Sequence, residues 1–174
     1  QQAKEITRTS RNRSQGDKLI RELRSDTERR QDSRFIMGNM YLMTYDPKHK
    51  DTLPYYDRFP LVIVLDKAEG GFLGLNLHYL PPVLRAKFLD GLIDTTNNKL
   101  YTDDSRFLVT YKMLKASARL KYFKPCVKHY LTTQVRSRFA RVPAPEWEIA
   151  TFLPTADFAK SSKGSVYSDS RRAI

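Results

Sequence analysis

Ten lysines and arginines between Ser105 and Pro145 are the residues of this chain whose type and spacing best fit a binding chemistry. The segment contains no aspartate or glutamate. Like charges three or four residues apart on a helix destabilise it by about 0.2–0.5 kcal/mol per pair, so a solvated helix face normally mixes both signs. The unmixed run indicates that negative charge comes from an anionic partner, although a cationic surface without a dedicated partner is the simpler alternative. The predicted partner- or nucleic-acid-binding residues are Arg106, Lys112, Lys115, Arg119, Lys121, Lys124, Lys128, Arg136, Arg138 and Arg141.

Aromatic residues are interleaved with these cations, among them Tyr111, Tyr122, Phe123, Tyr130 and Phe139. Aromatic rings can stack on bases while lysines and arginines hold phosphates. Helical spacing gives these rings a second interpretation as a buried stripe, which we favour. None of the recognised nucleic-acid motifs, such as an RNP pair, a KH loop or a zinc knuckle, occurs in the sequence.

No set of residues with catalytic or metal-binding spacing is evident. The three histidines and the single cysteine lie far apart in the sequence: His49, His78, His129 and Cys126. None has the short spacing that zinc sites use. Asp103 and Asp104 can hold a cation, but capping a helix explains them equally well. We therefore predict a protein that is not an enzyme and has no cofactor and no metal.

The formal net charge of +12 over 174 residues points to an anionic partner or an acidic neighbouring subunit. The charge is uneven: residues 1–34 carry +4, residues 35–110 carry −1 and residues 111–174 carry +9. A hydrophobic fraction of 40% is sufficient for a core. No apolar run approaches the ~20 residues that a membrane-spanning helix needs, and the N-terminus is polar rather than signal-like. We expect no membrane partner.

The central residues favour a β-hairpin. We expect a first strand within residues 35–45 and a strand covered on both faces at residues 61–65, which are Leu-Val-Ile-Val-Leu. Gly70 and Gly71 supply the backbone freedom of a tight turn, and residues 72–80 alternate as a returning strand. His78 falls on the polar face of that strand. Gly74 indicates a bulge or a close approach of another backbone.

Helices are expected to follow the hairpin. Pro82 opens one that runs to about Asp94, a second begins near Ser105, and Pro125 starts a third that carries residues 127–131. The basic residues then lie on the outer faces of the last two. Alternation within residues 146–153 predicts a final strand. The fold class is α+β, with a small antiparallel sheet or partial barrel, a central hairpin at 61–80, and helices inserted before the last strand.

Both ends of the chain are poor in apolar residues. We predict an extended basic N-terminal arm at residues 1–34, a core domain at 35–158 and a polar C-terminal tail at 159–174. A short helix capped by Asp17 would give the arm one small apolar patch. Its predicted contact residues are Leu19, Ile20, Leu23, Arg21 and Arg24.

Two segments carry a resemblance to a known family. They are YLMTYDPKHKDTLPYYDRFPL at residues 41–61 and GFLGLNLHYLPP at residues 71–82, followed by Arg85-Ala-Lys. Here the chain resembles small virion proteins of large contractile-tailed bacteriophages. The resemblance implies a structural role in the tail or baseplate and carries over no catalytic residues. It also implies that Asn76, His78 and Tyr79 are a signature of the fold or of a subunit contact.

The sequence therefore predicts a non-enzymatic structural protein of a phage virion, assembled in the host cytoplasm as part of a multi-subunit particle. In this hypothesis it docks onto other virion proteins, as a tail or baseplate component, through its basic surface and arms. Charge complementarity would supply orientation and association rate more than affinity. The alternative is a DNA-binding virion protein that contacts phosphates without regard to sequence, for example at the head–tail junction or at a DNA end.

Overall fold

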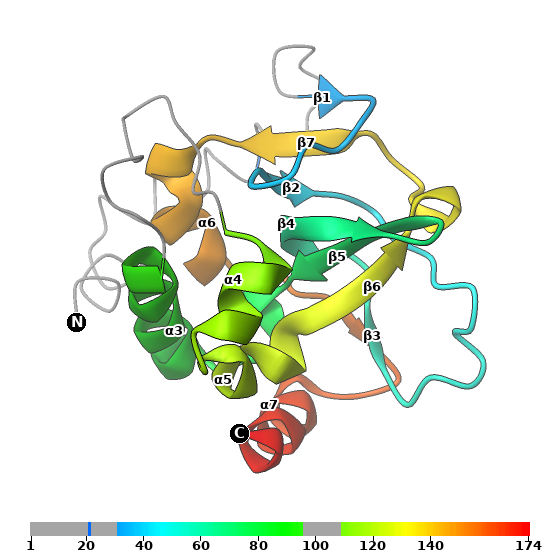
Figure 1. Cartoon of the computed structure of the whole chain (residues 1–174). Coiled ribbons are helices and arrows are strands. Elements are labelled where there is room, and N and C mark those ends of the chain that lie inside the picture. The colour runs from blue at the N-terminus through cyan, green and yellow to red at the C-terminus, as the bar shows by residue number, and fades with distance from the viewer. Residues whose placement is uncertain (1–20, 22–30, 96–108) are drawn as a thin grey trace.

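Strand β4 (Leu61–Ala68) lies inside a six-stranded antiparallel sheet. The computed structural model describes residue 21 and residues 31–95 and 109–174 (Figure 1). The strands follow one another across the sheet as β1 (Gln31–Asp32), β7 (Phe139–Val142), β2 (Met40–Leu42), β4, β5 (Gly71–Leu75) and β6 (Val127–Leu131). A separate two-stranded sheet pairs β3 (Tyr56–Asp57) with β8 (Phe158–Ala159). The α+β class is confirmed, and the six-stranded sheet is open rather than a partial barrel, with β1 and β6 at its edges.

Strand β4 is covered on both faces, as its continuous apolar sequence predicts. Leu61, Ile63 and Leu65 belong to a large core cluster that includes residues of the helices. Val62 and Val64 point to the opposite face, where they pack in a second cluster that is rich in aromatic rings. In Figure 1 the helices gather on one side of the sheet. Because successive side chains of a strand point to opposite faces, β4 contributes to both hydrophobic clusters.

The β4–β5 hairpin is confirmed, and its glycines have distinct roles. Gly70 takes a φ of 74°, which the turn requires. A Cβ at Gly71 would lie 1.9 Å from the carbonyl oxygen of Tyr130, so β6 can approach β5 only at a glycine. A Cβ at Gly74 would lie 2.9 Å from the Tyr130 ring, so a side chain rather than a backbone comes close there. The predicted bulge is present opposite Gly74, where the register of β4 shifts between Val64 and Asp66.

The returning strand ends at Leu75, earlier than predicted. The Asn76 side chain accepts a hydrogen bond from the backbone N–H of His78 at 3.0 Å and caps the short 3-10 helix η2 (Leu77–Tyr79). The strand period therefore stops, and His78 is buried rather than placed on a polar face. An asparagine that bonds its own local backbone competes with strand formation.

Helix α3 (Pro82–Thr95) confirms the helix predicted after Pro81. The next predicted helix is shorter than expected in the described part: Thr110 caps α4 (Tyr111–Ala116), and a left-handed Ala118 (φ 56°) separates it from α5 (Leu120–Phe123). The proposed caps Asp103 and Asp104 lie outside the described residues. Leu114 and Phe123 are buried, so the inward face of these helices is as predicted.

Two elements have the opposite secondary structure to the prediction. Pro125 lies in a 3-10 turn, η4 (Lys124–Cys126), after which the predicted third helix is strand β6, paired with β5 along its whole length. Residues predicted as the last strand form helix α6 (Trp147–Phe152). Trp147 and Ala150, three residues apart, are its buried face. Segments of five or six residues fit either period, and pairing with neighbours decides between them.

The C-terminal tail is not an irregular segment. Ser162 caps helix α7 (Lys163–Ala173), whose Val166 and Ser170 are buried. The buried guanidinium of Arg85 fastens this helix to the domain: it donates to the Tyr167 hydroxyl (3.0 Å) and to the backbone carbonyls of Leu80, His78 and Thr151. The predicted N-terminal arm lies mostly outside the described residues, including Leu19, Ile20, Leu23 and Arg24. Its last part forms β1, and Arg21 is helical and exposed.

Candidate nucleic-acid interface

The predicted basic residues divide into two groups on the surface. The first group lies on α4, α5, η4 and β6 and comprises Lys112, Lys115, Arg119, Lys121, Lys124 and Lys128. The four lysines of α4, α5 and η4 are exposed, and within the described residues none of them forms an ion pair. Arg119 is half-buried and donates to the carbonyl of Gly91. Arg106 lies outside the described residues.

The second group lies in the segment between β6 and β7 and in β7 itself. It comprises Arg136, Arg138 and Arg141, which are all exposed. Three strands separate β7 from β6, which at ~4.8 Å per step places the two strands ~19 Å apart. Arg136 and Arg141 lie 3.7 and 4.0 Å from the carboxylates of Asp46 and Asp32. The prediction that the basic residues all lie on the outer faces of two helices is therefore wrong. Folding places Asp46 beside Arg136 and Asp32 beside Arg141, although these acids are distant in the sequence.

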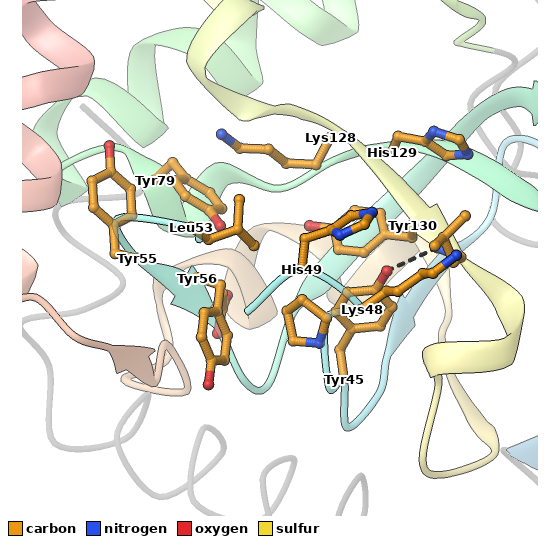
Figure 2. Close-up of a pocket in the computed structure, with 13 residues that line it drawn as sticks. Tyr45, Lys48, His49, Leu53, Tyr55, Tyr56, Tyr79, Lys128, His129 and Tyr130 are labelled. Carbon is orange, nitrogen blue, oxygen red and sulfur yellow. Dashed lines mark hydrogen bonds between the residues drawn. The ribbon is translucent and has the colours of Figure 1, made fainter. Parts of the chain in front are cut away.

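A cleft of about 450 Å³ opens beside the first group, between the 47–53 loop, β3, η2 and β6 (Figure 2). Five tyrosines line it: Tyr45, Tyr55, Tyr56, Tyr79 and Tyr130. Four basic side chains also line it: Lys48, His49, Lys128 and His129. Pockets for small molecules commonly measure about 300–1,000 Å³. The cleft thus has the size of a small-ligand site and combines aromatic rings with positive charge.

The tyrosines form a buried floor and a more open wall. Tyr45 and Tyr130 meet edge to face at 5.1 Å between ring centroids, and the Tyr45 hydroxyl accepts from the backbone N–H of Leu131 at 2.8 Å. Tyr55 and Tyr56 are half-buried. The Tyr55 ring lies 6.3 Å from Tyr79, whereas Tyr56 makes no ring contact within the described residues. Tyr56 is therefore the one lining tyrosine without an aromatic neighbour in the described part of the chain.

Lys128 extends across the cleft, and its Nζ lies 4.2 Å from the centre of the Tyr79 ring (Figure 2). An ammonium over an aromatic face is held by the quadrupole of the ring. Burial lowers the pKa of Lys128 below its usual value, because a charged group loses hydration there. Within the part of the chain that the structure describes, Lys128 has no carboxylate partner.

The 47–53 loop that forms one side of the cleft is tied to the C-terminal region. Lys160 donates to the carbonyls of Lys50 and Leu53, the second at 3.1 Å. Asp46 and Lys50 form an ion pair of 3.0 Å on the same loop. These contacts fix the backbone that carries Lys48 and His49.

A buried polar network lies under the cleft. Asp57 accepts from Asn76 Nδ2 at 2.9 Å and lies 2.8 Å from His78 Nδ1, and the other ring nitrogen of His78 lies 3.0 Å from the Thr155 hydroxyl. Burial opposes the ionisation of Asp57, but His78, Asn76 and the backbone N–H of Phe59 hold its pKa below its usual value. Burial also lowers the pKa of His78, against the attraction of Asp57.

The order Asp57–His78–Thr155 has the connectivity of a hydrolytic triad, but its burial argues for a structural role. These three residues are only 2%, 0% and 3% exposed. A triad hydroxyl has to reach a substrate, and this one donates inside the core. Cys126 is also buried, and burial raises its pKa to about 12, so its thiol stays protonated. The described residues contain no cluster that could hold a metal ion and no helix able to cross a membrane.

A family comparison identifies the class of protein to which this chain is related. The model of the phage T4 terminal DNA protecting protein family matches residues 1–173. The chain belongs to this family. Comparison with curated proteins and with solved structures gives no match.

Membership in the terminal DNA protecting protein family confirms the prediction of a virion-associated phage protein. It gives no support to a place in the tail or baseplate. The description of the family instead favours the alternative hypothesis of a protein associated with DNA. Asn76 and His78, which we expected to mark either the fold or a subunit contact, are fully buried, so their role is in the fold.

Sequence reasoning located only part of the cleft. Lys128 is the one predicted binding residue that lines it. Tyr55 and Tyr56 were missed because they follow Pro54 in a segment without helix or strand periodicity. The available signal was the pair of adjacent tyrosines in a polar loop region, where binding residues are common. In an extended segment two adjacent side chains point to opposite sides, so both cannot be buried in one core.

Proposed function

We propose that this protein binds the ends of the phage's double-stranded DNA in the virion and shields them. The observation that carries the proposal is the match of residues 1–173 to a family described as terminal DNA protecting. The charge of the chain supports it. A net charge of +12 favours an anionic partner, and duplex DNA presents one negative charge per ~1.7 Å of its axis.

Phosphate contacts supply the affinity in this proposal. The exposed lysines of α4, α5 and η4 form one group of cations, and the arginines in and just before β7 form a second group. Lysine and arginine contacts to phosphate carry little sequence information, which suits a protein that must bind an end whatever its sequence. The same surfaces are available to acidic virion proteins, and we propose that such proteins hold the bound protein in the particle.

A competition experiment tests end binding. The full-length protein is mixed with a labelled linear duplex and challenged with either the same duplex or its covalently closed, relaxed circle. We expect linear competitor to displace the label at much lower concentration than circle, because only the linear molecule has ends. Equal competition by circle and linear DNA would contradict end binding and leave only general DNA binding. No binding at low salt would remove DNA as the partner.

A further inference from the structure

We propose that the tyrosine cleft binds one unstacked nucleotide at the end of a DNA strand. In this arrangement the base lies against Tyr56, and the adjoining phosphate contacts Lys128, while Lys48 adds positive charge at the opposite end of the cleft (Figure 2). The inference rests on the proposed function, since it names the site that would distinguish an end from the interior of a duplex. The cleft residues therefore act in addition to the two groups of surface cations.

The first argument is the chemistry of the lining. The ring of Tyr56 lines the cleft, is half-buried and packs on no other ring within the described residues, so we assign the base to this ring. Stacking of bases on aromatic side chains tolerates any sequence, because every base has a π-face. Leu53, 36% exposed, adds an apolar edge beside it.

The second argument is the charge of the cleft. Lys48 and Lys128 both line it, and the one acid among the lining residues, Asp57, is 2% exposed and bonded to Asn76 and His78. The negative charge of the Asp57 carboxylate is therefore paired with buried donors in the core and does not face a ligand in the cleft. Because the Tyr79 ring holds the ammonium of Lys128 in place, less side-chain entropy is lost when it meets a phosphate.

The third argument is size. A cleft of about 450 Å³ has the size of a site for one small ligand such as a nucleotide, whereas a duplex, whose major groove alone is ~12 Å wide, is too broad to enter it. A nucleotide inside a duplex must break its pairing and stacking to enter, at a cost of a few kcal/mol. The terminal nucleotide has only one stacking neighbour, so its entry costs less. The cleft would therefore favour ends without reading sequence.

The test compares matched variants in the competition between linear and closed circular DNA. Tyr56→Ala and Lys128→Met remove the stacking ring and the cation from the cleft. Tyr122→Ala removes a ring beside Lys121 on α5, within the proposed phosphate surface but outside the cleft, and Lys87→Met removes an exposed cation of α3. Any loss in either control should affect linear and circular DNA alike. Tyr56→Phe keeps the ring. Thermal unfolding of each variant shows that it folds like the unmodified protein.

We expect Tyr56→Ala to lose roughly 5- to 150-fold in affinity for linear DNA, which is what one base stack contributes, with little change for the circle. Lys128→Met should also lose affinity for linear DNA more than for the circle. Tyr56→Phe, Tyr122→Ala and Lys87→Met should keep the preference for linear DNA. If folded Tyr56→Ala and Lys128→Met proteins also keep it, the cleft is not the nucleotide site, although end binding itself stands. If the unmodified protein shows no preference, the proposed function fails first.

A modified DNA provides a second readout. An abasic residue replaces the terminal nucleotide of one strand, either 5′ or 3′, and an interior abasic residue is the control. Loss of the terminal base should weaken binding by the unmodified protein and should not weaken binding by Tyr56→Ala any further. The strand end that shows this coupling is the one in the cleft. Independent, multiplying losses at both ends would overturn a direct contact between Tyr56 and the base.

Discussion

At the scale of single residues, the candidate site depends on the buried carboxylate of Asp57. Asp57 belongs to a strand of only two residues that forms part of the cleft wall, and its carboxylate joins η2 to the segment before β8 through His78 and Thr155. The sequence offered no sign of this network, because Asp57, His78 and Thr155 are distant in the chain and each has an ordinary surface role as an alternative. Lys128 could be predicted from charge alone, but the ring beneath it could not.

Removal of Asp57 should destabilise the protein far more than removal of a comparable surface acid. Asp57→Ala leaves the buried donors of His78, Asn76 and the Phe59 backbone without their acceptor, and each such group costs about 1–3 kcal/mol. Asp157→Ala breaks only an exposed ion pair with Arg58 and should cost about 0–1 kcal/mol. Chemical denaturation measures both. Equal, small losses would contradict a structural role for the buried network.

The buried His78 should make stability depend on pH. Its pKa is lower in the folded protein than its ordinary value of 6.5, so the unfolded chain binds more protons below about pH 6.5. The free energy of unfolding should therefore fall as the pH drops from 7 to 5. In His78→Asn, whose amide can still donate to Asp57, this part of the pH dependence should be lost. A free energy that stays constant or rises over this interval in the unmodified protein would contradict the burial argument.

At the scale of elements, the approach of β6 to β5 positions Lys128, and glycines permit it. Gly71→Ala would put a Cβ 1.9 Å from the backbone of β6, so the strands must separate, at a cost of about 1–3 kcal/mol or more. Gly91→Ala, inside α3, meets no atom of the described residues outside its own helix closer than 3.8 Å and should stabilise the helix by up to about 1 kcal/mol. Thermal unfolding compares the two. If Gly71→Ala leaves the thermal stability unchanged, β5 and β6 can accommodate a methyl group between them, and the argument from close approach is wrong.

The elements that could be predicted are those whose own residues determine their structure. The β4–β5 hairpin has a β-branched run and a Gly-Gly turn, and α3 begins at Pro82 and continues for fourteen residues. Residues 127–131 and 147–152 are too short for periodicity to distinguish helix from strand. Their structures depend on pairing with β5 and on burial of Trp147, which are tertiary events. The same holds for α7, whose docking uses Arg85 from a distant helix.

At the scale of the whole molecule, the positive charge is spread over two groups of side chains separated by the sheet. Charge counting along the sequence found both groups but joined them into one surface. In the proposed function, the two groups make a broad contact with phosphates, and the narrower cleft makes a local one. Long-range attraction would bring DNA to the protein, and the cleft would then select an end.

Salt dependence should show which group contacts phosphate. Each phosphate neutralised on duplex DNA contributes about 0.9 to the slope of log affinity against log salt concentration. Arg136→Ala with Arg138→Ala, and separately Lys112→Ala with Lys115→Ala, should each lower that slope by about 2 if both groups touch DNA. A slope unchanged in both double variants would contradict phosphate binding by either group.

The most direct test of end protection is the rate at which an exonuclease degrades linear duplex DNA in the presence of the full-length protein. We predict that protein added in an amount just sufficient to occupy the ends slows digestion from the ends strongly but leaves an endonuclease acting on the closed circle unaffected. The cleft variant Tyr56→Ala should protect less than Tyr122→Ala. Digestion at the same rate with and without bound protein, or equal inhibition of both nucleases, would contradict the account.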